Sequence, residues 1–105
     1  MMRSRLCLRA KPGRRESLLH QLDQLELALA LSAQPGFLGG EVEVALDDDY
    51  SVAVIASWAS EGHYELWEGS PGCRQLLDEL DTLLAAEPES QVYRVVDAVG
   101  QGALT

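Results

Sequence analysis

The chain has 105 residues, of which 47% are hydrophobic and 24% are charged, and its formal net charge is −9. This length is typical of one domain, and the composition is that of a folded protein rather than a disordered one. Residues 16–105 contain all 17 acidic residues and only two basic ones, Arg74 and Arg94. The other basic residues all lie within residues 1–15. Because an acidic body repels phosphate groups and anionic headgroups, we expect neither a nucleic-acid partner nor a membrane partner.

The basic start of the chain is not followed by the apolar segment of a signal peptide, and no stretch approaches the about 20 apolar residues of a membrane helix. Cys7 and Cys73 are far apart in the sequence, and neither belongs to a CxxC or zinc-ligand pattern. We therefore expect a cytoplasmic protein with two free thiols and no metal or other cofactor. The acidic run at 47–49 is interpreted as a solvated hairpin loop, because adjacent loop acids rarely converge on one ion.

The first half of the chain predicts a strand, a long helix and a hairpin. Residues 5–10 alternate in polarity, as in a strand. Over residues 14–32, leucines recur at helical spacing as one continuous stripe: Leu18, Leu22, Leu25 and Leu29. After Pro35-Gly36 and Gly39-Gly40, residues 41–46 alternate and predict a strand, with Leu46 on its apolar side. A hairpin then leads to a strand at 51–58.

The second half predicts a short helix, a long helix and a last strand. Ser60-Glu61 is a helix start, and Ser70-Pro71 is an N-cap followed by proline, which begins a helix that ends near 87–88. The apolar face of this helix consists of Leu76, Leu77, Leu80, Leu83 and Leu84. Residues 91–99 form the last strand. The order of elements predicts an α+β fold with a ferredoxin-like βαββαβ antiparallel sheet, in a single domain over 1–105 with its core at about 5–98.

Both faces of the strand at 51–58 are apolar. Val52, Val54, Ala56 and Trp58 alternate with Ala53 and Ile55. Two helices cover only one face of a four-stranded antiparallel sheet, so the other face needs a partner. We therefore expect a homodimer in which the sheets of two copies face each other.

Aromatic side chains gather where this strand passes into the short helix. Trp58, His63, Tyr64 and Trp67 include both tryptophans of a chain that has few aromatic residues. Such a cluster suits a pocket for a flat organic ligand, but it also suits the plugged end of a small core. The residue types alone leave both interpretations open.

Several short motifs in this order resemble the antibiotic biosynthesis monooxygenase family of dimeric α/β barrels. They are Lys11-Pro12-Gly13, Gln34-Pro35-Gly36-Phe37-Leu38-Gly39 and Trp58-Ala59-Ser60-Glu61, followed at the family spacing by Tyr64, Trp67 and Ser70-Pro71. The resemblance covers about residues 5–98. It implies the dimeric barrel and either cofactor-free oxygenation of anthrones and hydroquinones by molecular oxygen or haem breakdown, and the fold alone does not choose between them.

The haem-degrading branch of the family does not match this sequence. Trp58 matches its tryptophan, but the branch also uses an asparagine, and this chain contains none. Its iron-binding histidine would fall on the helix after Ser70-Pro71, which reads CRQLL at 73–77, whereas His20 and His63 lie on other helices. Without an axial ligand we expect no haem.

The anthrone-oxidising branch is similar in using a tryptophan and a nearby tyrosine, which Trp58 and Tyr64 match. The asparagine of that branch is replaced by the apolar run 52–55, and its arginine lacks a counterpart at the family spacing. Arg74 is one candidate substitute, and Arg9 and Arg94, which could reach inward from strands, are the alternatives. Loss of a substrate proton requires an apolar slot, a base and donors for the developing oxyanion. Trp58 and Tyr64 offer donors, and His63 is the candidate base, although it lies about 100° from Tyr64 around the helix.

The sequence therefore predicts a cofactor-independent monooxygenase that oxidises a flat anthrone, hydroquinone or polyketide-type substrate. Trp58 and Tyr64 are the predicted catalytic residues, and His63, Trp67 and Arg74 are predicted to bind the substrate. Two alternatives stay open. One is a non-catalytic dimeric binding module, which the absence of asparagine favours, and the other is an isomerase or cyclase on the same fold.

Overall fold

A four-stranded antiparallel sheet and one layer of helices make up the structure, a computed structural model that describes residues 1–97. In chain order the elements are β1 (Met2–Arg9), α1 (Arg15–Gln24), α2 (Leu27–Ser32), β2 (Phe37–Val44), β3 (Ser51–Trp58), α3 (Glu61–Glu68), α4 (Pro71–Leu80), the 3-10 turn η1 (Asp81–Leu83) and β4 (Glu89–Arg94). The strand order is β2-β3-β1-β4, and all neighbours are antiparallel. The predicted ferredoxin-like fold is confirmed.

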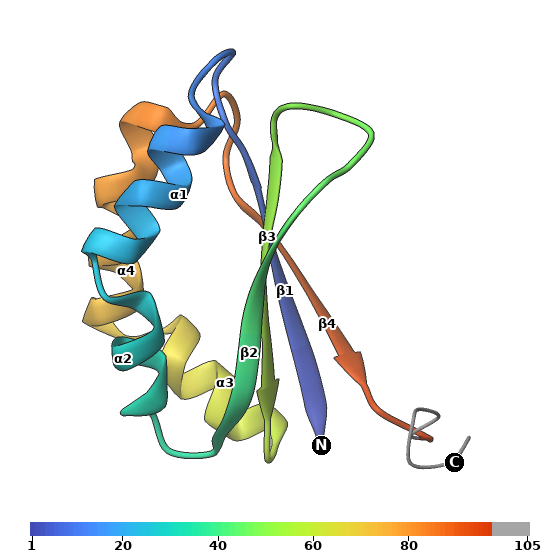
Figure 1. Cartoon of the computed structure of the whole chain (residues 1–105). Coiled ribbons are helices and arrows are strands. Elements are labelled where there is room, and N and C mark those ends of the chain that lie inside the picture. Colours follow the sequence, from blue (N-terminus) through green and yellow to red (C-terminus); the bar gives the residue numbers. More distant parts are fainter. Residues whose placement is uncertain (98–105) are drawn as a thin grey trace.

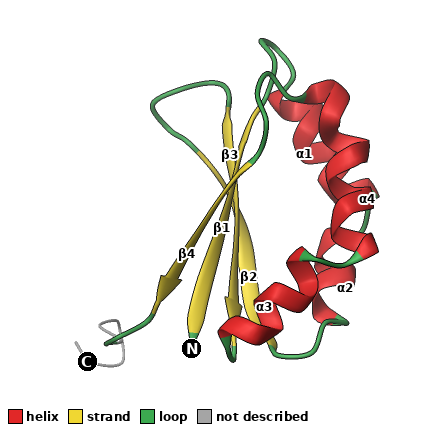
Figure 2. Cartoon of the chain, turned by 180° about the vertical axis from the view of Figure 1, so that it is seen from behind, coloured by secondary structure: helices red, strands yellow, loops and turns green. Residues whose placement is uncertain are grey.

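All the helices lie on one side of the sheet, and no described element covers the other side (Figure 1, and from behind Figure 2). The core lies between these two layers. Its most deeply buried large side chains are Trp58, Leu18, Leu80 and Val52. Residues on alternate positions of β1 and β3 face the helices, because successive side chains of a strand point to opposite faces.

The open face of the sheet carries charged side chains on β1 and β2 and is apolar along β3. Arg5 on β1 and Glu43 on β2 reach toward each other across β3, at 3.8 Å between Nη2 and Oε1. Beneath them Ala53 and Ile55 are 8% and 7% exposed. The expectation of two apolar faces therefore holds for β3 but not for its neighbours, and the homodimer stays a prediction.

The expected single helix over 14–32 is two helices. Glu26 adopts a left-handed backbone with φ of 52°, which ends α1 and redirects the chain into α2. The buried leucines of α2 are consequently Leu27 and Leu31, while Leu29, expected in the stripe, is 65% exposed.

Strand boundaries differ from the predicted ones where pairing extends them. β1 begins at Met2, because Met2 pairs with both Trp58 and Arg94. β2 already begins at Phe37 and carries a register shift before Gly39, and Leu46 lies beyond it, fully exposed. The helix expected to run to 87–88 ends as α4 at Leu80, with η1 after it, and β4 ends at Arg94. Residues 98–99 of the predicted last strand lie outside the described residues.

One residue of the acidic run, Asp48, stabilises the turn of the β2–β3 hairpin. The Asp48 carboxylate accepts hydrogen bonds from the backbone N–H groups of Tyr50 and Ser51, each at 2.7 Å. These bonds lower the pKa of Asp48 below its ordinary value of 3.8. Arg15 ties this loop to α1 by donating to the carbonyl oxygen of Asp48 at 2.7 Å.

Within residues 1–97, no helix has the length and apolarity needed to cross a bilayer.

Candidate active site between the sheet and the helices

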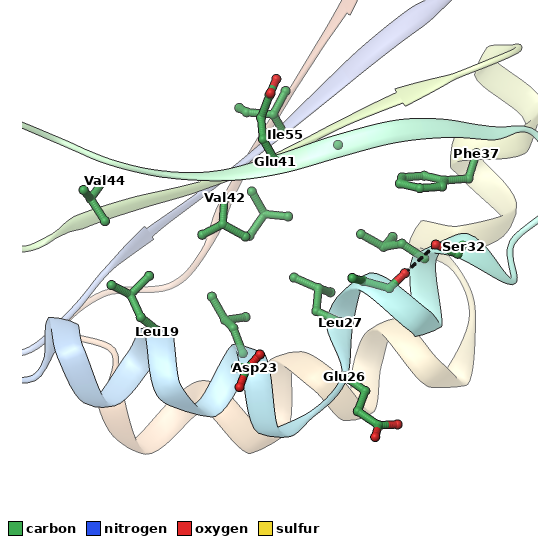
Figure 3. A pocket seen from close by; sticks show the side chains of 15 residues that line it. Leu19, Asp23, Glu26, Leu27, Ser32, Phe37, Glu41, Val42, Val44 and Ile55 are labelled. Carbon is green, nitrogen blue, oxygen red and sulfur yellow. Dashed lines mark hydrogen bonds between the residues drawn. The ribbon is translucent and has the colours of Figure 1, made fainter.

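An open groove with a volume of about 640 Å³ lies between the edge strand β2 and helices α1 and α2 (Figure 3). Its walls are mostly apolar, and they include Leu19, Leu22, Leu27, Leu31, Phe37, Val42, Val44 and Val54. Glu41 and Ile55 point away from it on the far side of β2, and the Glu26 carboxylate also turns outward. This volume falls in the range of about 300–1,000 Å³ that small-molecule sites occupy.

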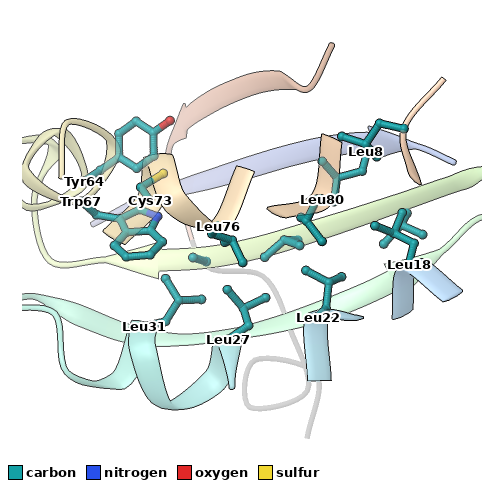
Figure 4. Close-up of a cluster of buried hydrophobic side chains, with 14 of the residues drawn as sticks. Leu8, Leu18, Leu22, Leu27, Leu31, Tyr64, Trp67, Cys73, Leu76 and Leu80 are labelled. Carbon is teal, nitrogen blue, oxygen red and sulfur yellow. The ribbon is translucent and has the colours of Figure 1, made fainter. Parts of the chain in front are cut away.

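A smaller cavity of about 90 Å³ lies between the sheet and helices α3 and α4. Tyr64, Trp67 and Cys73 gather around it at one end of the core (Figure 4), and its other polar lining residues are Ser4, Arg5, Glu68 and Ser90. Four side chains line both the groove and this cavity: Leu22, Leu27, Leu31 and Val54. One layer of side chains therefore separates the two spaces.

The polar centre of the small cavity is a hydrogen-bonded pair on α3. The Tyr64 hydroxyl donates to Oε2 of Glu68 at 2.6 Å, across one helical turn, and Tyr64 is only 8% exposed. Burial, and then the bond to the carboxylate, raise the pKa of Tyr64 to about 12, against a smaller opposing effect of the Ser90 hydroxyl. The phenol is therefore neutral at physiological pH.

Cys73 forms a neutral part of the cavity wall. Burial, and then the nearby negative charge of Glu68, raise the pKa of its thiol above the ordinary value of 9.0. A protonated thiol is neither a strong nucleophile nor a metal ligand. No group of three or more metal-ligating side chains occurs among the described residues.

Trp58 packs against Tyr64 and lines neither the groove nor the small cavity. It is fully buried, and its indole N–H donates to Oγ of Ser4 at 3.0 Å. Its ring meets Tyr64 edge-on, with centroids 6.1 Å apart, and it meets Phe37 in the same way at 5.5 Å. The indole donor is thus already engaged within the fold.

The structure brings three of the five predicted site residues together and leaves two outside. Tyr64 and Trp67 are buried on the same side of α3, and Trp58 touches Tyr64. His63 points elsewhere because one helical step turns a side chain by about 100°. Arg74 is exposed on α4 and lines neither the groove nor the cavity.

His63 takes part in the start of α3. Its Nδ1 lies 2.7 Å from Oγ of Ser60, and the same oxygen accepts from the His63 backbone N–H at 3.3 Å. The imidazole packs on Gly36, where an added Cβ would lie 2.2 Å from Cγ of the ring. Gly36 has φ of 77°, so glycine suits this position for two reasons.

The sequence reasoning missed the polar partners Glu68, Ser4 and Ser90. The spacing of Tyr64 and Glu68, four residues apart on a predicted helix, was a usable signal for their contact. Ser4 and Ser90 join the cavity through the pairing of β1 with β3 and β4, and local patterns do not specify such pairing.

Comparison with known proteins identifies the family. The family model described as antibiotic biosynthesis monooxygenase matches residues 1–79. The chain belongs to the antibiotic biosynthesis monooxygenase family. The resemblance drawn from the sequence motifs is thereby confirmed, whereas no curated protein matches the sequence.

Solved structures share the fold of this family member along nearly its whole length. One is an antibiotic biosynthesis monooxygenase, so named, from Deinococcus radiodurans, with 24% identity and a TM-score of 0.77. The match covers 96% of this chain and 98% of that chain. Another is SnoaB, a cofactor-independent oxygenase from Streptomyces nogalater, with 17% identity, coverage of 95% and 97%, and a TM-score of 0.78. A conserved protein from Methanosarcina mazei Go1 has 18% identity, coverage of 89% and 90%, and a TM-score of 0.74. At these identities the likeness concerns the fold.

Proposed function

We propose that this protein is a cofactor-independent monooxygenase that oxidises a flat aromatic substrate, such as an anthrone or a hydroquinone, with molecular oxygen. The observation that carries the proposal is an apolar groove of ligand size that shares wall residues with the cavity of the part-buried Tyr64–Glu68 pair. Family membership and the fold shared with SnoaB, itself a cofactor-independent oxygenase, support the same reaction class.

The volumes assign different parts of the substrate to the two spaces. A cavity of about 150 Å³ holds a single benzene ring, so the 90 Å³ space beside Tyr64 is too small for a polycyclic substrate. The 640 Å³ groove is large enough. The ring system lies in the groove, and its acidic carbon reaches Tyr64 when Leu27 or Leu31 turns aside.

The chemistry requires a site that removes one proton and excludes water. Loss of a proton turns an anthrone into an electron-rich enolate, which passes one electron to O₂. The resulting radical pair combines to a peroxide. Its remaining C–H bond and its O–O bond then break, which leaves one oxygen atom as the new carbonyl and releases the other, with the two protons, as water. The apolar walls of the groove reduce the contact of this anion with solvent, and the protein supplies a proton acceptor and orientation.

Three aromatic residues have different roles in this proposal. Tyr64 touches the substrate, and Trp67 forms a flat wall of the inner space. Trp58 holds Tyr64 in place through their edge-on contact. His63 and Arg74 receive no role in catalysis, because the one packs on Gly36 and the other faces solvent.

We also propose a cytoplasmic homodimer formed through the open face of the sheet. Its central residues Ala53 and Ile55 are apolar, and Tyr93 on β4 exposes 53% of its surface there. Light scattering on the eluted protein tests this assembly. We expect a dimer that Ile55→Glu converts to a monomer, and a wild-type monomer would contradict it.

A proton-transferring isomerase or cyclase is the second candidate. The Tyr64–Glu68 pair favours it, because such a pair moves protons without needing oxygen. The chain also lacks the asparagine that the anthrone-oxidising branch uses.

The decisive experiment is aerobic turnover of a panel of anthrones and hydroquinones under isotopically labelled oxygen. We expect oxygen uptake and one labelled atom in the product, with kcat/KM about 100-fold lower in Tyr64→Phe. Tyr50→Phe is the matched control, because Tyr50 lies in the β2–β3 hairpin and lines neither space. Uptake no faster than the uncatalysed background across the panel would contradict the monooxygenase.

A further inference from the structure

The direction of the hydrogen bond in the Tyr64–Glu68 pair determines what the site offers a ligand. A carboxylate only accepts hydrogen bonds, so the hydrogen between Tyr64 Oη and Glu68 Oε2 belongs to the tyrosine. At 2.6 Å this is a short, charge-assisted bond. With its hydrogen directed at Glu68, Tyr64 presents only lone pairs to the cavity, and it accepts a hydrogen from a ligand instead of donating one.

We propose that Glu68 is the proton acceptor of this site and that Tyr64 relays the proton to it. The inference rests on the proposed function for the location of the substrate, and it assigns the base that the sequence reasoning placed at His63. His63 is held by Ser60 and by its packing on Gly36, and it does not line the cavity.

The groups around the pair are consistent with a negative charge on Glu68 rather than on Tyr64. Burial keeps the Tyr64 phenol and the Cys73 thiol protonated, and Ser4 and Ser90 are neutral. Arg5 also lines the cavity, but its guanidinium pairs with Glu43 on the open face of the sheet. Glu68 is exposed, so a proton that reaches its carboxylate can pass on to water.

The proton step is balanced without an oxidant. The acidic C–H bond of an anthrone breaks, its proton binds Oη of Tyr64, and the electron pair moves onto the anthrone oxygen as an enolate. In the same step the O–H bond of Tyr64 breaks and its proton binds Oε2 of Glu68. Tyr64 ends unchanged, Glu68 ends neutral, and one negative charge has moved from Glu68 to the substrate.

Deuterium exchange under nitrogen tests this step apart from oxygenation. Anthrone is incubated in D₂O with the protein, and incorporation of deuterium at the acidic carbon is followed by mass spectrometry. We expect exchange above background for the wild-type protein and a loss of about 10²-fold for Glu68→Gln, because glutamine still accepts the Tyr64 hydrogen bond but is not a base. Glu65→Gln on the same helix is the matched control and retains the wild-type rate.

The pH profile adds a reading that a merely structural role would not change. Wild-type exchange depends on pH, and we expect Glu68→Gln to lose this dependence while Glu65→Gln keeps it. The melting temperatures of the two variants, Glu68→Gln and Glu65→Gln, should agree. Equal exchange in Glu68→Gln and Glu65→Gln would overturn the inference, as would absence of exchange in the wild-type protein. Glu68-dependent exchange without oxygen uptake in air would instead refute the monooxygenase and leave the proton acceptor standing.

Discussion

The groove beside β2 and the cavity beside Tyr64 share wall residues, yet they divide the requirements of a reaction site between them. The groove has the volume for a polycyclic ligand, but its walls are mostly apolar. The cavity has a tyrosine–carboxylate pair, but it is too small for such a ligand. One layer of side chains, three leucines and Val54, therefore separates the space that can bind a ligand from the space that holds the reactive pair. Moving the side chains of that layer would join the apolar groove to the proton acceptor in the cavity.

The interruption after α1 places the separating leucines. Leu27 and Leu31 lie on α2, a helix of six residues that follows the left-handed Glu26. Had the helix continued, Leu25 and Leu29 would occupy its inner side. The feature that the leucine pattern failed to predict is thus the one that separates groove from cavity.

Removing part of the separating layer has the largest expected effect. Leu27→Ala should lower the free energy of unfolding by about 2–5 kcal/mol, because it leaves a void between sheet and helices. It should also join the two spaces and raise kcat for bulky substrates. Leu18→Ala, a fully buried control that lines neither space, should be destabilised similarly without a gain in kcat. Equal kcat changes in both variants would show that Leu27 separates nothing relevant to turnover.

Altering the support of the polar cavity comes next. Trp58→Phe should lower the free energy of unfolding by about 2–3 kcal/mol, since it leaves a void and deprives the buried Ser4 hydroxyl of its donor. Adding Ser4→Ala should restore about 1 kcal/mol, because a hydroxyl without a partner is then no longer buried. Urea unfolding measures both values, and additive losses would mean that the indole–Ser4 bond contributes nothing.

A charge in the groove should change binding without changing the reaction step. Val42 faces the groove and is 45% exposed, so Val42→Arg is tolerated by the fold but places a charge against the ring system. We expect KM about 10-fold higher with kcat unchanged, which corresponds to about 1.4 kcal/mol. Leu38→Arg, on an exposed position of the same strand, is the control. A fall in kcat with constant KM would place the ring system elsewhere.

The smallest expected effect concerns alkaline stability. The pKa of Tyr64 is raised from 10.0 to about 12, so the folded state holds this proton at pH values where the unfolded chain has lost it. The stability gained is complete below pH 10 and is lost as the pH rises through 12. Denaturant unfolding on either side of pH 10 should therefore show a steeper loss in the wild-type protein than in Tyr64→Phe. Parallel curves would mean that Tyr64 titrates normally.

The sequence predicted those parts of the molecule that local patterns specify. The order of elements, the strand at 51–58 and the leucine face of α4 follow from periodicity and capping, and the structure has them. The turn at Glu26 was missed because leucines continue at helical spacing across it, and a left-handed glutamate leaves no mark in such a pattern. Leu46 was misplaced because alternation continues past the last paired residue, Val44.

The candidate site was predictable only in part. Trp58, Tyr64 and Trp67 were found from their clustering, and the structure places them together. The contact of Ser4 with Trp58 joins residues 54 positions apart and depends on the strand register. His63 lies apart from the cavity, because sequence proximity to Tyr64 does not imply a shared helix face, and its role in binding stays a prediction.

We hold that the ring system of a substrate lies in the groove with its acidic carbon at Tyr64, and a crystal structure with a non-oxidisable anthracene analogue tests this placement. We expect the rings between β2 and helices α1 and α2, the Leu27 or Leu31 side chain turned aside, and a carbon of the central ring in contact with Tyr64 Oη. A ligand on the open face of the sheet, or one in the groove with the leucine layer still closed over Tyr64, would contradict it.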